Sequence, residues 1–98
     1  MTSYFISRHL GALDWLQQQS ITVDHQLAHL EIDRIQAGDT VIGTLPINLV
    51  AELNARGARY LHLTLDLPAE IRGQELTAET MHTLGARLEA YSAQKLSK

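Results

Sequence analysis

The chain has 98 residues, 45% of them hydrophobic and 19% charged, a balance typical of one globular domain rather than of a disordered chain. It has no cysteine, which excludes disulfides, thiolate metal sites and a cysteine nucleophile together. The formal net charge is −3, from eight Lys and Arg against eleven Asp and Glu, so the chain lacks the broad basic surface of proteins that coat long nucleic acid. A small phosphate-bearing ligand needs only a few local cations and is compatible with this charge.

Neither a membrane segment nor an export signal is predicted. The sequence has no run of about 18 apolar residues that would span a bilayer. Residues 1–5 lack the basic start and the long apolar stretch of a signal peptide. We therefore expect a cytoplasmic protein without membrane contact, folded as one domain over residues 1–98 with a tail that frays from about residue 93.

The first half of the chain predicts a strand, a helix and two more strands. The apolar run at 4–6 is typical of a buried strand, and apolar residues at helical spacing follow over 9–19. A second strand is predicted over 26–30 and a third, rich in β-branched residues, over 40–45. A turn at 36–39 separates these two strands.

The second half predicts a helix, a strand and a last helix. Pro46 in the first turn and Gly57 just past the end mark the first of these helices. Alternating residues over 59–67 predict the fourth strand, and a loop follows at 68–74. Thr77 caps the last predicted helix, whose apolar face has helical spacing: Met81, Leu84, Leu88 and Tyr91.

The predicted order β-α-β-β-α-β-α defines a small α/β domain. Short connections and right-handed crossovers favour a mostly parallel sheet flanked by helices on both faces, a small Rossmann-like arrangement. Ligands of such sheets bind outside the carboxyl ends of the strands. This rule selects three stretches, which are residues 7–9 after the first strand, 43–48 after the third and 66–72 after the fourth.

The first stretch combines three groups that can handle a phosphate. Ser7 can donate a hydrogen bond to a phosphate oxygen, and Arg8 matches a phosphate with its planar, permanently charged guanidinium. His9 can act as a general acid or base near neutral pH. The alternative is that Ser7 only caps the following helix while Arg8 and His9 are solvated, and the tripeptide alone does not decide between the two.

The other two stretches are more ambiguous. Gly43 can let a ligand approach the backbone, Thr44 can contact a phosphate and Asn48 can bond to a base or a ribose. Residue types alone favour an ordinary helix start there, because Thr and Pro are common at such positions. Residues 66–75 form either a flap with Arg72 reaching inward or an exposed connection with Arg72 paired to Glu70 or Glu75.

No metal or other cofactor is predicted. His25 and His29 are four residues apart, but no carboxylate of the HExxH type lies between them, and the local pattern is as much strand as helix. Fingerprints of serine hydrolases, nucleotide triphosphatases and dinucleotide oxidoreductases are also missing from the sequence.

Four blocks of the sequence carry a family resemblance. They read YFISRHLGA at 4–12, GDTVIGTLP at 38–46, ARGARYLHL at 55–63 and LDLPAE at 65–70. With the residues around them, they cover most of the chain from residue 3 to about residue 91. In these blocks the chain resembles a small family of type III CRISPR-associated proteins, the Csx-sixteen family.

The resemblance implies a ring nuclease, which cuts cyclic oligoadenylate, most often cyclic tetraadenylate, and so switches off type III CRISPR antiviral signalling in a prokaryotic cytoplasm. It also implies a fold related to the Rossmann-like CARF domains and a homodimer. Ser7, Arg8 and His9 match the family's opening motif, and Thr44, Asn48 and Arg72 match the later ones. We assign catalysis to the first three residues and substrate contacts to Gly43, Thr44, Asn48 and Arg72.

The expected chemistry is metal-independent cleavage of a phosphodiester by the neighbouring ribose 2′-OH, aligned for in-line attack. Arg8 would stabilise charge on the phosphate oxygens, and His9 would transfer a proton. The product would be linear diadenylate ending in a 2′,3′-cyclic phosphate. Two other classes also fit, namely a module that binds cyclic oligoadenylate without cutting it and a protein that docks on a larger CRISPR effector.

Overall fold

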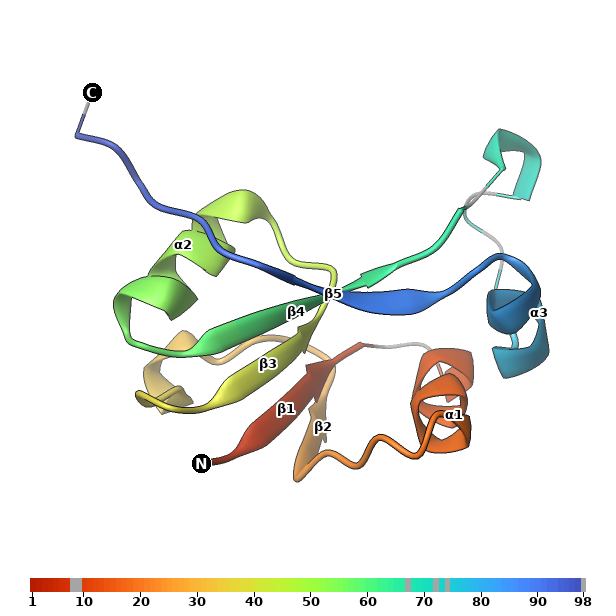
Figure 1. Cartoon of the computed structure of the whole chain (residues 1–98), viewed down its shortest axis with the longest axis horizontal. Coiled ribbons are helices and arrows are strands. Elements are labelled where there is room, and N and C mark those ends of the chain that lie inside the picture. The colour runs from red at the N-terminus through yellow and green to blue at the C-terminus, as the bar shows by residue number, and fades with distance from the viewer. Residues whose placement is uncertain (8–9, 67, 72, 74, 98) are drawn as a thin grey trace.

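The computed structural model describes residues 1–7, 10–66, 68–71, 73 and 75–97. These residues form one five-stranded sheet in the order β2-β1-β3-β4-β5 (Figure 1). The strands are β1 (Ser3–Ile6), β2 (His25–Leu27), β3 (Thr40–Gly43), β4 (Arg59–Thr64) and β5 (Arg87–Tyr91). The first four strands are parallel, and β5 runs antiparallel to β4. The predicted class, a small α/β domain with a mostly parallel sheet compatible with a Rossmann-like fold, is confirmed.

Helices cover both faces of this sheet, as predicted. The described residues form α1 (Leu10–Gln18), α2 (Ile47–Ala55) and α3 (Ala78–Thr83). Val50 and Leu53 of α2 pack into one core cluster, whereas α1 and α3 pack into a second cluster on the other face (Figure 1). The split follows from right-handed crossovers, because the chain moves one way along the sheet from β1 to β2 and the opposite way from β3 to β4.

Successive residues of each strand point to opposite faces of the sheet and so contribute to the two core clusters in turn. Tyr4 and Val41 face the α2 side, while their neighbours Phe5 and Ile42 face the side of α1 and α3. All four side chains are at most 5% exposed, which explains why these strands read as continuous apolar runs.

The predicted helix over 77–91 is wrong in its second half. Its start is confirmed, since the Thr77 hydroxyl accepts the Thr80 N–H at 3.1 Å, but α3 ends at Thr83. Gly85 then adopts a φ of 74°, and residues 87–91 form β5, the edge strand beside β4. Met81 and Leu88 reach the same core cluster, one from a helix and the other from a strand. The apolar residues with helical spacing therefore belong to two elements, α3 and β5, and not to one helix. The predicted order β-α-β-β-α-β-α lacked this final strand.

The remaining differences are shifts of boundaries. The second strand covers 25–27 rather than 26–30, and the fourth ends at Thr64. The predicted loop at 68–74 contains a short 3-10 helix, Ala69–Ile71. Gly57 follows α2 with a φ of 88°, as predicted for the residue beyond a helix end. No helix in the described part of the chain has the length and apolar character needed to cross a membrane.

Two carboxylates hold β1 at the amino edge of the sheet. Asp39, only 5% exposed, accepts the N–H groups of Thr2 and Gln36, each at 2.9 Å. Asp24 accepts the Ser3 N–H at 2.8 Å and the Ser3 hydroxyl at 3.1 Å. Because these bonds favour the charged form, they lower the pKa of both carboxyls below the ordinary value of 3.8.

The lowered pKa of Asp39 predicts how stability depends on pH. A carboxyl with a depressed folded pKa contributes stability that is present above its unfolded pKa and is lost as the pH falls through the folded pKa. In Asp39→Asn only one side-chain oxygen remains to accept the two N–H groups. We expect this variant to unfold at lower urea concentration than the wild type at pH 7, with a difference that shrinks below about pH 4.

Urea titrations followed by circular dichroism between pH 3 and 7 measure this effect. Asp14→Asn, at an exposed position on α1, is the matched control and should keep the wild-type midpoint. Equal midpoints for Asp39→Asn and the wild type at pH 7 would contradict the role of Asp39.

Candidate functional site

Two of the predicted stretches meet at the carboxyl edge of the sheet. Ser7 directly follows β1, and Thr44 directly follows β3, the parallel neighbour of β1. The backbone of Ser7 is fixed on both sides, because its N–H donates to the Leu27 carbonyl at 2.9 Å and its carbonyl accepts a bond from the Gln26 side chain. In the order 2-1-3-4-5, the chain direction along the sheet reverses between β1 and β3, which is the place where doubly wound sheets bind ligands.

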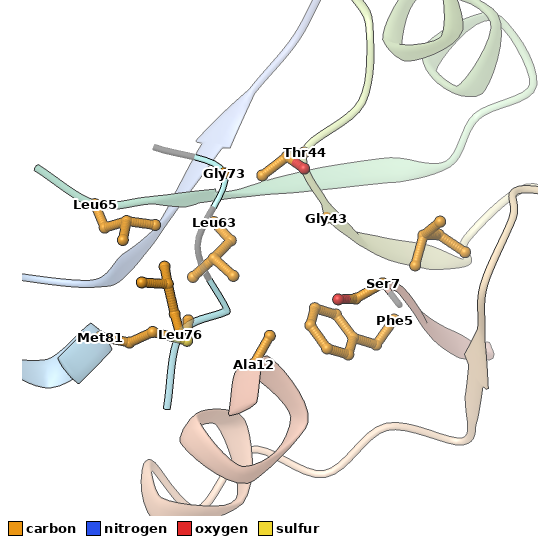
Figure 2. Close-up of a pocket in the computed structure, with 11 residues that line it drawn as sticks. Phe5, Ser7, Ala12, Gly43, Thr44, Leu63, Leu65, Gly73, Leu76 and Met81 are labelled. Carbon is orange, nitrogen blue, oxygen red and sulfur yellow. The ribbon is translucent and has the colours of Figure 1, made fainter. Parts of the chain in front are cut away.

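A cavity of about 290 Å³ opens at this point, on the face that carries α1 and α3. Ser7, Gly43 and Thr44 lie along one side of it (Figure 2). The opposite side is apolar and includes Leu65, Leu76 and Met81. The cavity thus combines two hydroxyl groups at one side with an apolar interior, the usual make-up of a small-molecule site.

Two glycines allow the close contacts that shape this cavity. A Cβ on Gly43 would lie 3.0 Å from the Ile6 carbonyl oxygen, so a side chain there would push β1 and β3 apart. A Cβ on Gly11, in the first turn of α1, would collide with the Leu76 carbonyl oxygen. Gly43 therefore allows the carboxyl ends of β1 and β3 to lie close together, and Gly11 allows the backbone at Leu76 to lie against α1.

Tyr60 holds the loop that carries Thr44. Its side chain is 2% exposed, and its hydroxyl donates to the Gly43 carbonyl at 2.9 Å. The same hydroxyl accepts the Leu45 N–H at 2.9 Å and lies 2.7 Å from His62 Nδ1. One phenol thus bonds the residues on both sides of Thr44. It is a positioning residue, because it reaches the cavity only through that loop.

Burial raises the pKa of the Tyr60 phenol above its ordinary value of 10.0, an effect that the bond from Leu45 partly opposes. The phenol is therefore neutral at physiological pH and keeps the proton that it donates to Gly43. The sequence analysis identified Tyr60 only as an apolar strand residue, since alternation along a strand shows the face that a side chain occupies but not the partner of its hydroxyl.

Asn48, the other described residue predicted to contact substrate, lies elsewhere. It is exposed on the first turn of α2 and borders a groove between that helix and residues 92–95. That groove includes neither Ser7 nor Thr44. The structure therefore does not bring Asn48 together with the residues at the cavity. Arg8, His9 and Arg72, three further predicted site residues, lie outside the residues that the structure describes.

The third stretch, residues 66–75, borders the cavity through Gly73. Leu65 precedes the stretch and Leu76 follows it, and Gly73 lines the cavity from within it. Closure of this segment over a ligand stays a prediction.

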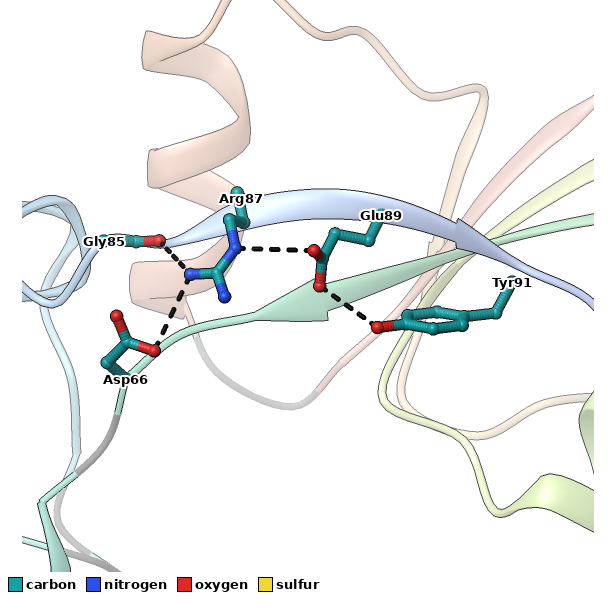
Figure 3. Close-up of polar contacts among 5 residues, drawn as sticks. All are labelled: Asp66, Gly85, Arg87, Glu89 and Tyr91. Atoms are coloured by element: carbon teal, nitrogen blue, oxygen red, sulfur yellow. Dashed lines mark hydrogen bonds and ion pairs between the residues drawn. The ribbon is translucent and has the colours of Figure 1, made fainter.

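The start of the stretch is held by an ion-pair network around Arg87 of β5 (Figure 3). The guanidinium lies 3.8 Å from the Asp66 carboxylate and 3.6 Å from that of Glu89, and it donates to the Gly85 carbonyl at 3.0 Å. Two carboxylates thus offset the charge of Arg87, which makes it a poor ligand for an anion. The network could not be expected from the sequence, because β5 was predicted as helix.

Within the described ranges, no group of three or more His, Cys, Asp or Glu side chains is arranged to hold a metal ion. The residues at the cavity offer hydroxyl groups and apolar surface instead, which suit an uncharged ring system and a phosphate better than a cation.

Comparison with known proteins identifies the family of this chain. The family described as "Putative CRISPR-associated protein (Cas_VVA1548)" matches residues 4–94, nearly the whole chain. The chain belongs to this CRISPR-associated family. No curated protein and no solved structure matches the chain. The matched range includes β3, β4 and β1 from Tyr4 onward, and so it covers every described residue at the cavity.

The position of Tyr60 predicts a specific loss in Tyr60→Phe. This variant keeps the ring but leaves the Gly43 carbonyl and the Leu45 N–H without their shared partner. We expect the free energy of unfolding to fall by about 1–3 kcal/mol. Amide hydrogen exchange at Leu45 should also become faster, because that N–H loses its acceptor, and NMR measures this directly.

Tyr91→Phe is the matched control for this experiment. The Tyr91 hydroxyl donates to Glu89 at 3.3 Å on the exposed surface of β5, so its removal should change stability by no more than about 0.5 kcal/mol. If the two variants lose equal stability and leave Leu45 exchange unchanged, Tyr60 does not hold the loop.

Proposed function

We propose that this CRISPR-associated protein is a metal-independent ring nuclease that cleaves cyclic oligoadenylate, with cyclic tetraadenylate as the preferred substrate. The observation that carries the proposal is the convergence of Ser7, Gly43 and Thr44 on one cavity at the reversal point of the sheet. The family membership adds the CRISPR context, in which cyclic oligoadenylate is the small phosphodiester ligand implied by the resemblance of the sequence.

The size and lining of the cavity support an adenylate substrate. A volume of about 290 Å³ lies at the lower end of ligand pockets, so it suits one base or nucleoside and not a whole cyclic tetranucleotide. Apolar walls suit the faces of a purine, and the hydroxyls of Ser7 and Thr44 suit the phosphate next to it. The rest of the ring would then lie outside, along the carboxyl edge of the sheet.

The proposed reaction depends mainly on how the protein aligns groups that the substrate already carries. The substrate supplies its own nucleophile, the ribose 2′-OH beside each phosphate, and fixing this group in line with the 5′-oxygen removes much of the barrier. The Ser7 and Thr44 hydroxyls would donate to the non-bridging oxygens, and α1, which begins at Leu10, has its partially positive end beside Ser7. Arg8 and His9, adjacent to Ser7 in the sequence, would supply charge stabilisation and proton transfer.

A homodimer fits this chemistry. Two copies related by a two-fold axis would present two identical cavities to a cyclic tetranucleotide of matching symmetry, and two opposite cuts would release linear diadenylate. A few cations from each subunit would then be enough for four phosphates, which reconciles the ligand with a net charge of −3.

Incubation of the purified protein with labelled cyclic tetraadenylate in EDTA tests the function. We expect linear diadenylate with a 2′,3′-cyclic phosphate, detected by chromatography and mass spectrometry. Retention of the intact ring without any product would support a binding module instead. If the ring is neither cut nor retained, the protein does not act on this ligand, and docking on a CRISPR effector becomes the better proposal.

The role assigned to Arg8 predicts a large loss of activity in Arg8→Ala. Removal of one charge-stabilising donor typically slows such a reaction about 100- to 1,000-fold, and the far-ultraviolet circular dichroism should not change. Arg59→Ala is the control, because Arg59 is an exposed residue at the amino end of β4, away from the carboxyl edge. Cleavage by Arg8→Ala at the wild-type rate would show that the site has been assigned to the wrong residues.

A further inference from the structure

A second hollow of about 680 Å³ lies at the same edge of the sheet and shares a wall with the cavity. Both include Ile6, Ser7 and Thr44 in their linings. The cavity continues to Ala12 of α1 and Met81 of α3, whereas the second hollow continues to Leu49 of α2. Since α2 covers the opposite face of the sheet, Ser7 and Thr44 form a ridge with one hollow on each side.

A ridge with a hollow on each side suits a dinucleotide step. A phosphodiester carries one nucleoside on each side of its phosphate, so a phosphate bonded to the two hydroxyls on the ridge directs its two nucleosides into the two hollows. Each hollow is large enough for one nucleoside. A single adenylate would leave one of them unused.

We propose that the two hollows bind the two nucleosides that flank the scissile phosphate, and that His29, in the second hollow, is a catalytic residue for that phosphate. The proposal rests on the proposed function and adds to it a second nucleoside subsite and a second proton-transfer group.

His29 has the required position and chemistry. It lies two residues beyond the end of β2, at the same carboxyl edge as Ser7, and β2 is the neighbour of β1. Its side chain is exposed to the hollow and to solvent. Among the described residues that line either hollow, it alone carries an imidazole, a side chain that can both accept and return a proton. The remaining lining is apolar, hydroxyl or backbone.

The step balances without any added reagent. The ribose 2′-oxygen attacks phosphorus, its proton passes to the free imidazole nitrogen of His29, and the bond between phosphorus and the 5′-oxygen breaks. The 5′-oxygen takes a proton from solvent, and the imidazolium later returns its proton to solvent. The products are a 2′,3′-cyclic phosphate and a 5′-hydroxyl, with no net consumption of water.

Kinetics of His29→Ala test the catalytic role. We expect kcat for cyclic tetraadenylate to fall about 100-fold or more with little change in KM, and free imidazole to restore part of the rate. A purely structural role would not respond to imidazole. His82→Ala removes an exposed imidazole on α3, outside both hollows, and should keep the wild-type kcat. An unchanged kcat in His29→Ala would overturn the assignment.

Methyl NMR with linear diadenylate, ApA, tests the two subsites without any cleavage. We expect ApA to shift the methyl signals of Ala12 and Met81 in the cavity and also those of Ala28 and Leu49 in the second hollow. Shifts confined to one of the two sets, or missing from both, would overturn the two-sided arrangement.

The two experiments separate this inference from the proposed function. If the wild type leaves cyclic tetraadenylate intact while ApA shifts both sets of methyl signals, the nuclease proposal fails and the two-sided site stands. If the wild type cuts the ring while ApA shifts only one set, the nuclease proposal stands and the two-sided site is wrong.

Discussion

The parallel pairing of β1 with β3 is the constraint on which the rest of the structure depends. These central strands pair from Ser3 with Thr40 to Phe5 with Ile42, and the chain leaves them in opposite directions along the sheet. Right-handed crossovers then require α1 and α2 to lie on opposite faces. A hollow is left on each side of the point where the two directions diverge, and Ser7 and Thr44 stand between them.

The two edges of the sheet have different chemistry. At the amino edge, Asp24 and Asp39 use their carboxylates to hold the backbone of residues 2 and 3. At the carboxyl edge, the described residues around the ridge offer hydroxyls, a histidine and apolar side chains. Negative charge therefore stabilises the fold where no ligand is proposed, and none of the described residues that line the two hollows carries a carboxylate. An overall charge of −3 does not oppose an anionic ligand under this arrangement.

The antiparallel strand β5 completes the sheet on the side of β4. The ion pairs of Arg87 are partly exposed, and such pairs typically contribute about 0–1 kcal/mol each. The five paired positions from Tyr60–Tyr91 to Thr64–Arg87, together with packing of Leu88 into the core, therefore account for most of the attachment of β5. This strand also supports β4, which carries Tyr60 beneath the loop of Thr44.

The sequence by itself determined the elements with strong local signals. Continuous apolar runs identified β1 and β3, Gly57 and Thr77 marked helix ends, and the rule for open α/β sheets selected Ser7, Gly43 and Thr44. Tertiary structure decided what depends on contacts between distant residues. Residues 87–91 fit a helix by spacing and became a strand because β4 offered a free edge. Only folding placed the hydroxyl of Tyr60 between Gly43 and Leu45 and put His29 in the lining of the same hollow as Ser7, since no local pattern records which distant groups will be neighbours.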